Sequence, residues 1–256
     1  MQNKPIGFFD SGVGGLSVLK YAIEIMPEEN YIYFGDSLNA PYGTKSREQV
    51  YSLTETAING LIKQGVKAIV IACNTATSIA VDELRKKINI PIISMEPAIK
   101  PALEKTSGKV LLLATQVTMS SERVNMLIDK YDIENRVIKV SCPQLAKKIE
   151  DAVFGKSNIE EYLLELLEPY KNVNVTAMVL GCTHYPFAKE MIKNIIGDNV
   201  KIFDGIDGTV VHLKEILIKH NIKNTQKTKG FLKIQSSLKG EKTLELYNKL
   251  LNGGVL

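Results

Sequence analysis

Two cysteines stand at matching places in the chain, and a thiol at such a place can carry acid–base or nucleophilic chemistry. The apolar run at 68–72 ends on Cys73, and the apolar run at 177–181 ends on Cys182. Each run has the length of a buried strand, and polar residues suited to a helix start follow it. Each thiol is therefore expected where a strand passes into a helix, the place where open α/β sheets bind ligands and helix N–H groups attract anions. A helix N-terminus is also expected to lower the thiol pKa toward the pH at which an enzyme works, so that part of the thiol is thiolate.

Each cysteine has a candidate partner for proton exchange. His184 follows Cys182 by two residues, and Asp10 and Ser11 end the first expected strand, which commonly lies beside the strand that leads to Cys73. An imidazole and a carboxylate can exchange protons with a thiol or orient it. Taken alone, a cysteine at the end of a buried strand is most often a small core residue. The matched context of the two cysteines favours chemistry.

A glycine-rich turn at 10–15, Asp-Ser-Gly-Val-Gly-Gly, follows the first expected strand. It is similar to the dinucleotide-binding fingerprint, and Asp36 lies near the position of a ribose-binding acid. However, Ser17 occupies the third glycine position, and Asp10 at the strand end would repel a pyrophosphate. The alternative is that the glycines let the backbone approach a small anionic ligand such as a carboxylate. The loop at 41–43, Pro-Tyr-Gly, is an ordinary turn or a loop that closes over a site.

Strands and helices are expected to alternate along the chain, the pattern of parallel βα units. The expected strands are 6–9, 31–35, 68–72, 91–93, 110–114, 137–140, 175–180 and 200–203. The expected helices are 14–26, 46–64, 75–88, 118–131, 144–152, 159–167 and 187–196. From about residue 208 a helix, a strand at 231–234 and a final helix complete the chain.

The two series of elements resemble an internal repeat. Residues 8–11 align with 112–115 at an offset of 104, and Cys73 and Cys182 are offset by 109. The expected fold is α/β, with two similar open parallel-sheet βα domains related by pseudo-twofold symmetry and the active site between them. The expected domains are 1–96 together with 208–256, and 97–207. Two unrelated βα series that each contain a cysteine are the alternative.

Composition limits the partners of the protein. In 256 residues, 32 Lys and Arg against 28 Asp and Glu give a net charge of +4, too weak to indicate a nucleic-acid partner. No apolar segment is long enough for a signal peptide or a membrane span, so we expect a cytoplasmic protein with no membrane partner. The lysines between 214 and 242 form no compact block, which favours a solvated face over a polyanion site.

The remaining cysteine and histidine residues favour neither disulfides nor a metal. Three cysteines without a Cys-x-x-Cys pair indicate free thiols, with Cys142 a structural one. A zinc site at Cys73, Cys142, Cys182 and His184 lacks the paired ligand spacing. The histidines at 212 and 220 lie on an expected helix and are interpreted as surface or packing residues.

Four motifs, taken in order, resemble the glutamate racemases of the aspartate/glutamate racemase superfamily. They are Asp-Ser-Gly-Val-Gly-Gly-Leu at 10–16, Pro-Tyr-Gly at 41–43, Cys-Asn-Thr-Ala at 73–76 and Leu-Gly-Cys-Thr-His-Tyr-Pro at 180–186. The resemblance implies a cofactor-independent isomerase that interconverts L- and D-glutamate. It also implies a supply of D-glutamate for peptidoglycan synthesis, and thus for cell wall and cell shape, and a homodimer.

The resemblance also implies roles for individual residues. Cys73 and Cys182 match the two acid/base residues, with Asp10 and His184 as their assistants and Glu150 as a further carboxylate. The positions that match substrate contacts are Asp10, Ser11, Pro41, Tyr42, Gly43, Asn74, Thr75, Thr115, Thr183 and His184. The chain departs from the family pattern at Ser37, at Ala98 and in the segment 141–145, and the last departure leaves the placement of Glu150 open.

Inversion of an α-carbon explains why two thiols would be needed. A proton must leave one face and another must arrive on the opposite face, so two bases must flank the substrate. The sulfurs should then lie too far apart for a disulfide. Without a cofactor, oriented N–H groups and hydroxyls from the Ser11, Asn74, Thr75 and Thr183 segments must stabilise the carbanion. A racemase of another amino acid such as aspartate, and a dinucleotide-binding or redox module, remain the alternatives.

Overall fold

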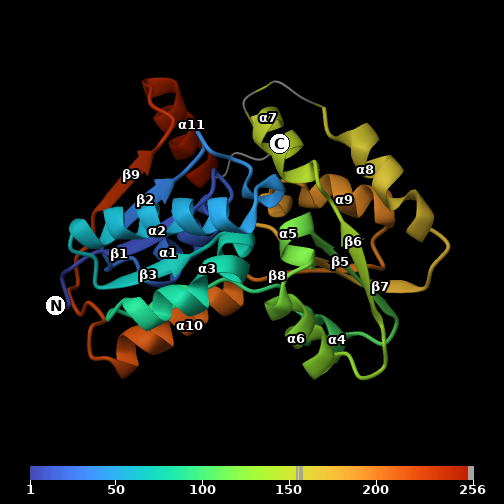
Figure 1. The fold of residues 1–256 in the computed structure, drawn as a ribbon, viewed down its shortest axis with the longest axis horizontal. Helices are drawn as coiled ribbons and strands as arrows, with labels where there is room; N and C mark the ends of the chain where they lie inside the picture. Colours follow the sequence, from blue (N-terminus) through green and yellow to red (C-terminus); the bar gives the residue numbers. More distant parts are fainter. Residues whose placement is uncertain (154, 156–157, 253–256) are drawn as a thin grey trace.

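The computed structural model describes residues 1–153, 155 and 158–252, which form two lobes, each built on a parallel sheet (Figure 1). The first sheet has the strand order β4-β3-β1-β2-β9 and the second has the order β6-β5-β7-β8. The strands are β1 (Ile6–Asp10), β2 (Tyr31–Gly35), β3 (Ala68–Ile71), β4 (Ile92–Ser94), β5 (Lys109–Ala114), β6 (Val137–Ser141), β7 (Val175–Leu180), β8 (Lys201–Asp204) and β9 (Leu232–Ser236). The expected α/β class is confirmed.

The two sheets repeat one topology. In each, the first strand is central and the second and third strands pair with it on either side, so β4-β3-β1-β2 corresponds to β8-β7-β5-β6. The register agrees as well, because Phe9 pairs with Ile71 and Leu113 pairs with Leu180. Cys73 and Cys182, two residues beyond these paired strand ends, therefore occupy corresponding positions. The strand β9 has no counterpart in the second sheet and lies at the edge beside β2.

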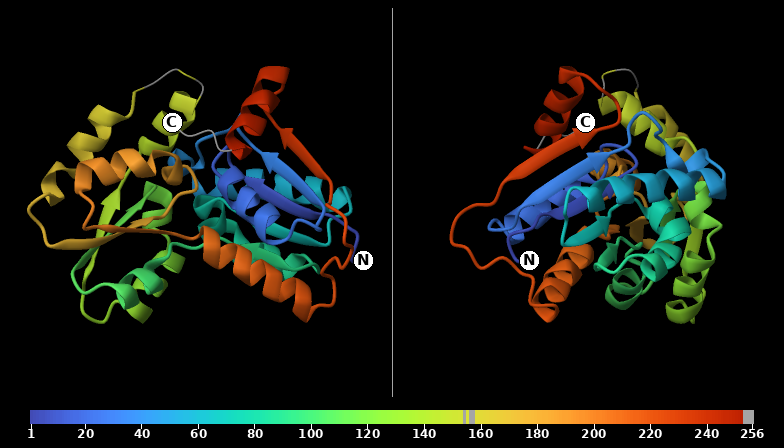
Figure 2. Two further views of the ribbon diagram at one scale, coloured as in Figure 1. Left: turned by 180° about the vertical axis from the view of Figure 1, so that it is seen from behind. Right: turned by 60° about the vertical axis from the view of Figure 1, so that its left-hand side comes forward.

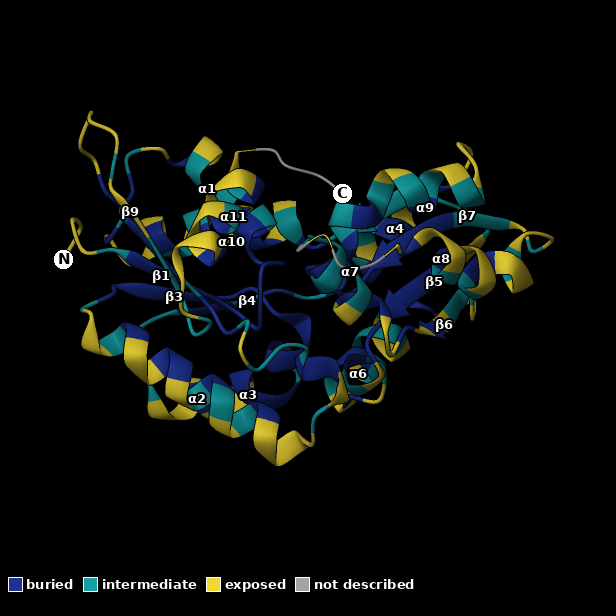
Figure 3. Cartoon of the chain, turned by 90° about the horizontal axis from the view of Figure 1, so that it is seen from above, coloured by how far each residue is buried: buried dark blue, intermediate teal, exposed yellow. Residues whose placement is uncertain are grey.

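Helices cover both faces of each sheet (Figures 2 and 3). They are α1 (Leu16–Ile25), α2 (Arg47–Lys63), α3 (Asn74–Lys87), α4 (Ile99–Lys105), α5 (Gln116–Met119), α6 (Glu122–Tyr131), α7 (Leu145–Val153), α8 (Glu160–Leu167), α9 (Lys189–Ile196), α10 (Ile206–Lys219) and α11 (Glu241–Leu251). In the first lobe α1, α10 and α11 cover one face, and α2 and α3 cover the other. In the second lobe α7, α8 and α9 lie opposite α4 and α6. Among the helices of the described residues, none combines the length and apolar character needed to cross a membrane.

The helices differ from the expected ones in two places. The expected helix at 118–131 is two helices, α5 and α6, because the Ser121 side chain caps α6 by accepting from the Val124 N–H and donates to the Thr118 carbonyl. A Ser side chain that binds nearby backbone groups favours a helix start over a helix interior. The helix α4 was not expected from the sequence. It has Pro101 in its first turn, where the missing N–H has no intrahelical partner to lose.

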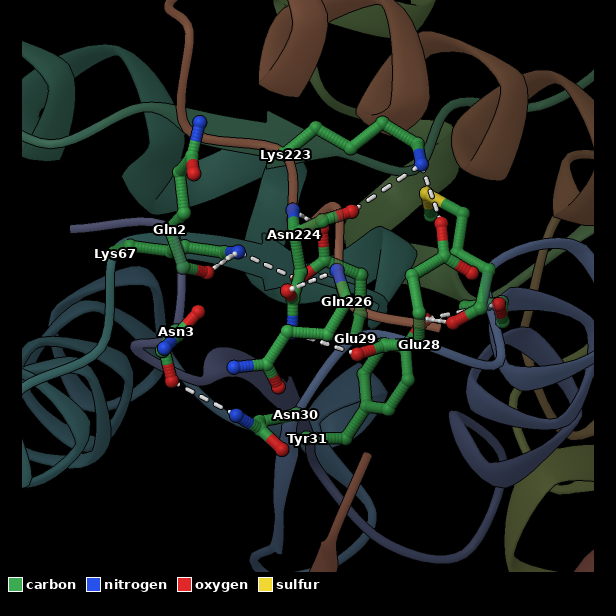
Figure 4. A network of polar contacts seen from close by, with 12 residues as sticks. Gln2, Asn3, Glu28, Glu29, Asn30, Tyr31, Lys67, Lys223, Asn224 and Gln226 are labelled. Carbon is green, nitrogen blue, oxygen red and sulfur yellow. Dashed lines mark hydrogen bonds and ion pairs between the residues drawn. The ribbon is translucent and has the colours of Figure 1, made fainter. Parts of the chain in front are cut away.

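A buried ion pair joins distant segments at the amino end of the first sheet (Figure 4). Lys67 Nζ lies 2.5 Å from Glu29 Oε2, and these side chains are 1% and 0% exposed. Lys67 also donates to the Gln2 carbonyl, and Glu29 Oε1 accepts from the Asn224 N–H at 2.7 Å. The pair thus links the N-terminus, the entries to β2 and β3 and the connection between α10 and β9. It lies at the opposite end of the sheet from Cys73.

Candidate active site

Cys73 lies where β3 passes into α3, as the sequence predicts. It is the N-cap residue of α3, and its Sγ accepts from the Ala76 N–H at 3.4 Å. The Ser11 hydroxyl, from the end of the neighbouring strand β1, lies 3.3 Å from the same sulfur. The residue is 4% exposed, so the thiol is enclosed by protein on nearly all sides.

Cys182 occupies the corresponding place after β7, but the backbone that follows it differs. A 3₁₀ turn at Tyr185–Ala188 comes first, and α9 begins at Lys189, two residues after the expected helix start at 187. The Tyr185 N–H bonds to the Cys182 carbonyl three residues back, which closes a tighter turn than an α-helix allows. This turn brings the His184 ring to the thiol, with Nδ1 3.9 Å from Sγ.

The environment of Cys73 keeps its sulfur protonated in the free protein. Burial and then the charge of Asp10 raise the Cys73 pKa to about 12, although hydrogen bonds from Ser11 and the Ala76 N–H oppose the shift. The expectation that the helix N-terminus lowers this pKa is therefore wrong, because desolvation outweighs the N–H contact. Cys182 contributes to the same shift, so the two sulfurs lie close enough to influence each other's charge. Both remain free thiols.

Asp10 is fully buried between the lobes. Its Oδ1 accepts from the Gly12 N–H at 2.9 Å, and its Oδ2 accepts from the Thr183 hydroxyl at 2.9 Å. Burial raises the Asp10 pKa above its usual range, against the charge of His184 and these two hydrogen bonds. Asp10 thus acts on Cys73 through its charge, whereas the hydrogen bond to that thiol comes from Ser11.

Glu150 and His184 form a buried pair beside Cys182. Glu150 Oε2 lies 2.5 Å from His184 Nε2, and the structure therefore places Glu150 on α7 in the site. Burial alone lowers the His184 pKa, but hydrogen bonds to Cys182 and Glu150 outweigh burial and raise it well above its usual range. For Glu150, burial raises the pKa, and the hydrogen bond and charge of His184 outweigh it and lower the pKa. His184 therefore carries its proton while Glu150 remains a carboxylate.

The glycine-rich turn lets side chains of the opposite lobe come close to its backbone. A Cβ added at Gly12 would lie 2.7 Å from Glu150 Oε2, and one at Gly14 would lie 2.7 Å from the Thr183 backbone. Because Glu150 and Thr183 fill this space, the turn has no room there for a pyrophosphate. Asp36, the candidate ribose-binding acid, instead accepts hydrogen bonds from Asn39 and Tyr42. Both observations disfavour a dinucleotide site.

The loop with Pro41, Tyr42 and Gly43 closes one side of the site. Pro41 leads into a 3₁₀ turn, Tyr42–Thr44, and the Tyr42 hydroxyl donates to Asp36 Oδ2 at 2.6 Å. A Cβ at Gly43 would lie 2.6 Å from Thr115 Cβ, so the loop packs directly against the second lobe. Because the Tyr42 hydroxyl proton is bound to Asp36, the donors that this loop can offer to a ligand are its backbone N–H groups.

Three threonine hydroxyls join the lobes on the Cys73 side. Thr75 Oγ1 lies 2.9 Å from Thr115 Oγ1 and 3.2 Å from Thr118 Oγ1. Thr75 and Thr115 were predicted site residues, and Thr118 was not. The three-residue spacing of Thr115 and Thr118 could have indicated this contact, because Thr115 caps α5 and its side chain accepts from the Thr118 N–H.

Asn74, the first residue of α3, carries a buried amide with unused hydrogen-bonding capacity. It is 3% exposed, and neither its Oδ1 nor its Nδ2 has a partner in the described part of the chain. Buried amides are almost always hydrogen-bonded, so an unpaired amide next to the Cys73 thiol indicates the place of a polar ligand. The structure thus brings Asn74 and both thiols together at one site.

The other candidates are a third buried thiol, which is close enough to Cys182 to be affected by its charge, and two exposed histidines. The Cys142 thiol is buried and donates to the Val140 carbonyl, as a structural thiol does. His212 and His220, on and after α10, are exposed. Among the described residues, no cluster of three or more His, Cys, Asp or Glu side chains could hold a metal ion.

The Glu150–His184 pair makes a testable contribution to stability. The raised His184 pKa stabilises the fold fully below the unfolded value of about 6.5 and less as pH rises through the folded value. The lowered Glu150 pKa stabilises the fold above the unfolded value of about 4.3. We expect Glu150→Gln to lower the free energy of unfolding by about 1.5–3 kcal/mol between about pH 4.5 and 6.5. The loss should shrink at higher pH.

Urea denaturation at a series of pH values measures this difference. Glu122→Gln, on the exposed first turn of α6, is the matched control, and we expect it to change stability by less than about 0.5 kcal/mol. A Glu150→Gln loss that stays constant from pH 5 to pH 9 would contradict the charged pair.

Comparison with known proteins agrees with this geometry. Residues 17–213 match the family described as Asp/Glu/Hydantoin racemase. A glutamate racemase of Clostridium acetobutylicum is 48% identical over 98% of this chain and 99% of its own length. The structure of a glutamate racemase isoform from Bacillus anthracis aligns with a TM-score of 0.86 at 27% identity, covering 100% of this chain and 96% of that one. That of the Francisella tularensis glutamate racemase in complex with D-glutamate aligns with a TM-score of 0.84 at 32% identity, over 100% and 96%. The chain therefore belongs to the Asp/Glu/Hydantoin racemase family and, within it, to the glutamate racemases.

Proposed function

We propose that the protein interconverts L- and D-glutamate by proton transfer between the substrate α-carbon and two thiols, Cys73 and Cys182. One observation carries the proposal: two free thiols end corresponding strands of two repeated sheets, next to the unpaired amide of Asn74. Thiols from opposite lobes can reach opposite faces of a substrate bound between them. The arrangement suits removal of a proton from one face and its return to the other.

In the proposed reaction, the two thiols exchange roles with direction. One thiolate removes the α-proton while the opposite thiol donates, and the reverse reaction swaps them. Cys73 is protonated in the free protein, so the substrate itself must favour its thiolate. The α-ammonium of glutamate, a positive charge brought between the lobes, lowers the pKa of a neighbouring thiol and offsets the negative charge of Asp10. On the other side, protonated His184 stabilises the thiolate of Cys182.

The intermediate carbanion requires hydrogen-bond donors that are already in place. The α-carboxylate takes up negative charge as the α-proton leaves, and preorganised N–H and O–H donors stabilise it. The N-terminus of α3 offers free N–H groups, and Asn74 offers its amide. The hydroxyls of Thr75 and Thr115 lie on the same side. In this arrangement the protein's own groups supply the stabilisation, without a cofactor.

The proposed biological role follows from the product. D-Glutamate is a component of peptidoglycan, so we propose that the protein supplies it for cell-wall synthesis in the cytoplasm and acts as a homodimer. Residues 1–96 with 208–256 would form one domain, and residues 97–207 the other. Membership of the glutamate racemases supports this role.

Solvent deuterium tests the reaction. We expect L- or D-glutamate incubated with the protein in deuterated water to racemise and to acquire deuterium at the α-carbon. The opposite enantiomer should form with near-complete label, because the incoming proton comes from a thiol that exchanges with solvent. Chiral chromatography and mass spectrometry measure both quantities.

A panel of amino acids tests the substrate. Aspartate, alanine and glutamine are run beside glutamate under the same conditions, and we expect glutamate to be racemised at least tenfold faster than the rest. Faster turnover of aspartate would assign another substrate to the same site. No turnover of any amino acid, with tight binding of a dinucleotide by calorimetry, would overturn the proposal.

A further inference from the structure

A chain of hydrogen bonds leads from the Glu150–His184 pair to the C-terminal helix. One oxygen of Glu150, Oε2, binds His184, and the other, Oε1, accepts from the Ser37 hydroxyl at 2.8 Å. Ser37 Oγ in turn lies 2.7 Å from the hydroxyl of Tyr247 on α11. The sequence motifs of the site include neither Ser37 nor Tyr247. This series of hydrogen bonds thus adds Ser37 and Tyr247 behind the Cys182 side of the site.

The direction of these hydrogen bonds follows from counting protons. Ser37 has one hydroxyl proton, which it gives to Glu150, so Tyr247 must be the donor to Ser37. The Tyr247 proton is then used, so the Ser236 hydroxyl, 3.1 Å away, must donate to Tyr247. All three protons point toward the Glu150 carboxylate. Hydroxyls aligned in this way polarise one another and favour the charged form of the acceptor.

The surroundings of Tyr247 fix its hydroxyl in one position. The residue is fully buried, and its ring packs edge-on against Tyr33 with centroids 6.0 Å apart. A Cβ at Gly35 would lie 2.6 Å from the Tyr247 hydroxyl oxygen, so the absence of a side chain there leaves the space that the hydroxyl occupies. Rigid packing of this kind is what holds a catalytic group in place from behind.

We propose that Tyr247 is a positioning residue that, through Ser37, holds Glu150 in place and thereby keeps His184 protonated and aimed at the Cys182 thiol. The proposal rests on the proposed two-thiol reaction, and it concerns one thiol only. Cys73 has different neighbours, namely Ser11, the Ala76 N–H and the charge of Asp10. Loss of the Tyr247 hydroxyl should therefore impair proton transfer at Cys182 and spare proton transfer at Cys73.

The titratable groups around the pair set the sign of the expected effect. Asp10 from β1, Tyr33 from β2, Tyr247 from α11 and Cys182 after β7 face Glu150 or His184. Asp10 and Glu150 repel each other as anions, so hydrogen bonds to Glu150 are needed to keep it charged. A weaker Ser37 donor raises the Glu150 pKa. Glu150 then carries less negative charge, and the pKa of His184 falls.

The test compares Tyr247→Phe with wild type in both directions of racemisation. We expect the limb of the pH–rate profile that reports His184 to move to lower pH by about 0.5–1 pH unit, the size set by one hydrogen bond. Ser37→Ala should shift it in the same direction by at least as much. Ser37→Thr, which keeps the hydroxyl, should restore the wild-type profile.

Isotope effects assign the change to one thiol. With α-deuterated substrates, slower transfer at Cys182 should raise the isotope effect on kcat/KM for the enantiomer whose α-proton faces Cys182 and reduce it for the other enantiomer. The values of kcat/KM for the two enantiomers themselves stay equal, because the equilibrium constant of a racemisation is one. A purely structural role for Tyr247 would lower stability without changing these opposite isotope effects.

Tyr31→Phe is the matched control. Tyr31, on β2, is also buried in the first lobe, and its hydroxyl shares its proton between the Ala22 and Met26 carbonyls, away from Glu150. We expect this variant to keep the wild-type pH profile and isotope effects at 25 °C. A Tyr247→Phe variant that is folded and shows the wild-type profile and isotope effects overturns the inference. Failure of the proposed function would be distinct, because wild type itself would then not racemise glutamate.

Discussion

Replacing either Cys73 or Cys182 with serine is expected to abolish steady-state racemisation, with a loss of at least about 10²–10⁴-fold in kcat, the usual contribution of a positioned acid or base. A serine hydroxyl in the place of either sulfur ionises far less readily than a thiol, so it cannot remove an α-proton. Each turnover in either direction needs both thiols, one as base and one as acid. Both variants should therefore lose the reaction from L- and from D-glutamate, as measured by chiral chromatography.

Cys142→Ser is the matched control for both variants. Its thiol is buried like the other two but donates to the Val140 carbonyl, a bond that a serine hydroxyl can also make. We expect this variant to keep turnover. Full turnover by both Cys73→Ser and Cys182→Ser would sink the two-thiol mechanism. Intact-protein mass spectrometry during turnover adds a second criterion, because a thiol that transfers protons forms no covalent adduct, whereas a nucleophilic thiol does.

The parts of the site that were predictable from the sequence lie at strand ends. An apolar run of strand length that ends on a cysteine fixes the thiol at the carboxyl edge of a parallel sheet, and the same pattern twice places Cys73 and Cys182 in corresponding positions. Asp10 and His184 were predictable for the same reason, since they are close to these edges in sequence. The start of α2 was also predictable from nearby residues, because the expected cap, Ser46, forms a capping box with Gln49.

The parts that were not predictable depend on contacts between segments that lie far apart in the sequence. Ser37 and Glu150 are 113 residues apart, and Ser37 and Tyr247 are 210 apart, so no local pattern reports their contact. The predicted direction of the Cys73 pKa shift is wrong for a related reason. An N-cap position can be read from the sequence, and Asp10 was expected nearby, whereas the full burial of the thiol, the largest cause of its raised pKa, appears only when the protein is folded.

The buried Lys67–Glu29 pair lies at the other end of the first sheet, and breaking it should affect stability and not chemistry. Lys67→Met leaves the Glu29 carboxylate without its cation, where the side chain is 0% exposed. Loss of one partner of a buried ion pair costs about 3–5 kcal/mol, because the remaining charge is desolvated without compensation. We therefore expect a loss of about this size in the free energy of unfolding, measured by urea denaturation.

A double variant separates the loss of the pair from the burial of one uncompensated charge. In Lys67→Met/Glu29→Gln, the glutamine carbonyl can still accept from the Asn224 N–H, and no net charge remains in the buried space. This variant should be more stable than Lys67→Met alone, because the desolvated anion is gone.

Lys86→Met, which breaks the exposed pair with Glu83, serves as control and should change stability by less than about 1 kcal/mol. Since the pair and Cys73 lie at opposite ends of the first sheet and Cys182 belongs to the second sheet, folded Lys67→Met should retain the wild-type kcat at 25 °C. A Lys67→Met variant as stable as wild type would show that the pair contributes nothing to the fold.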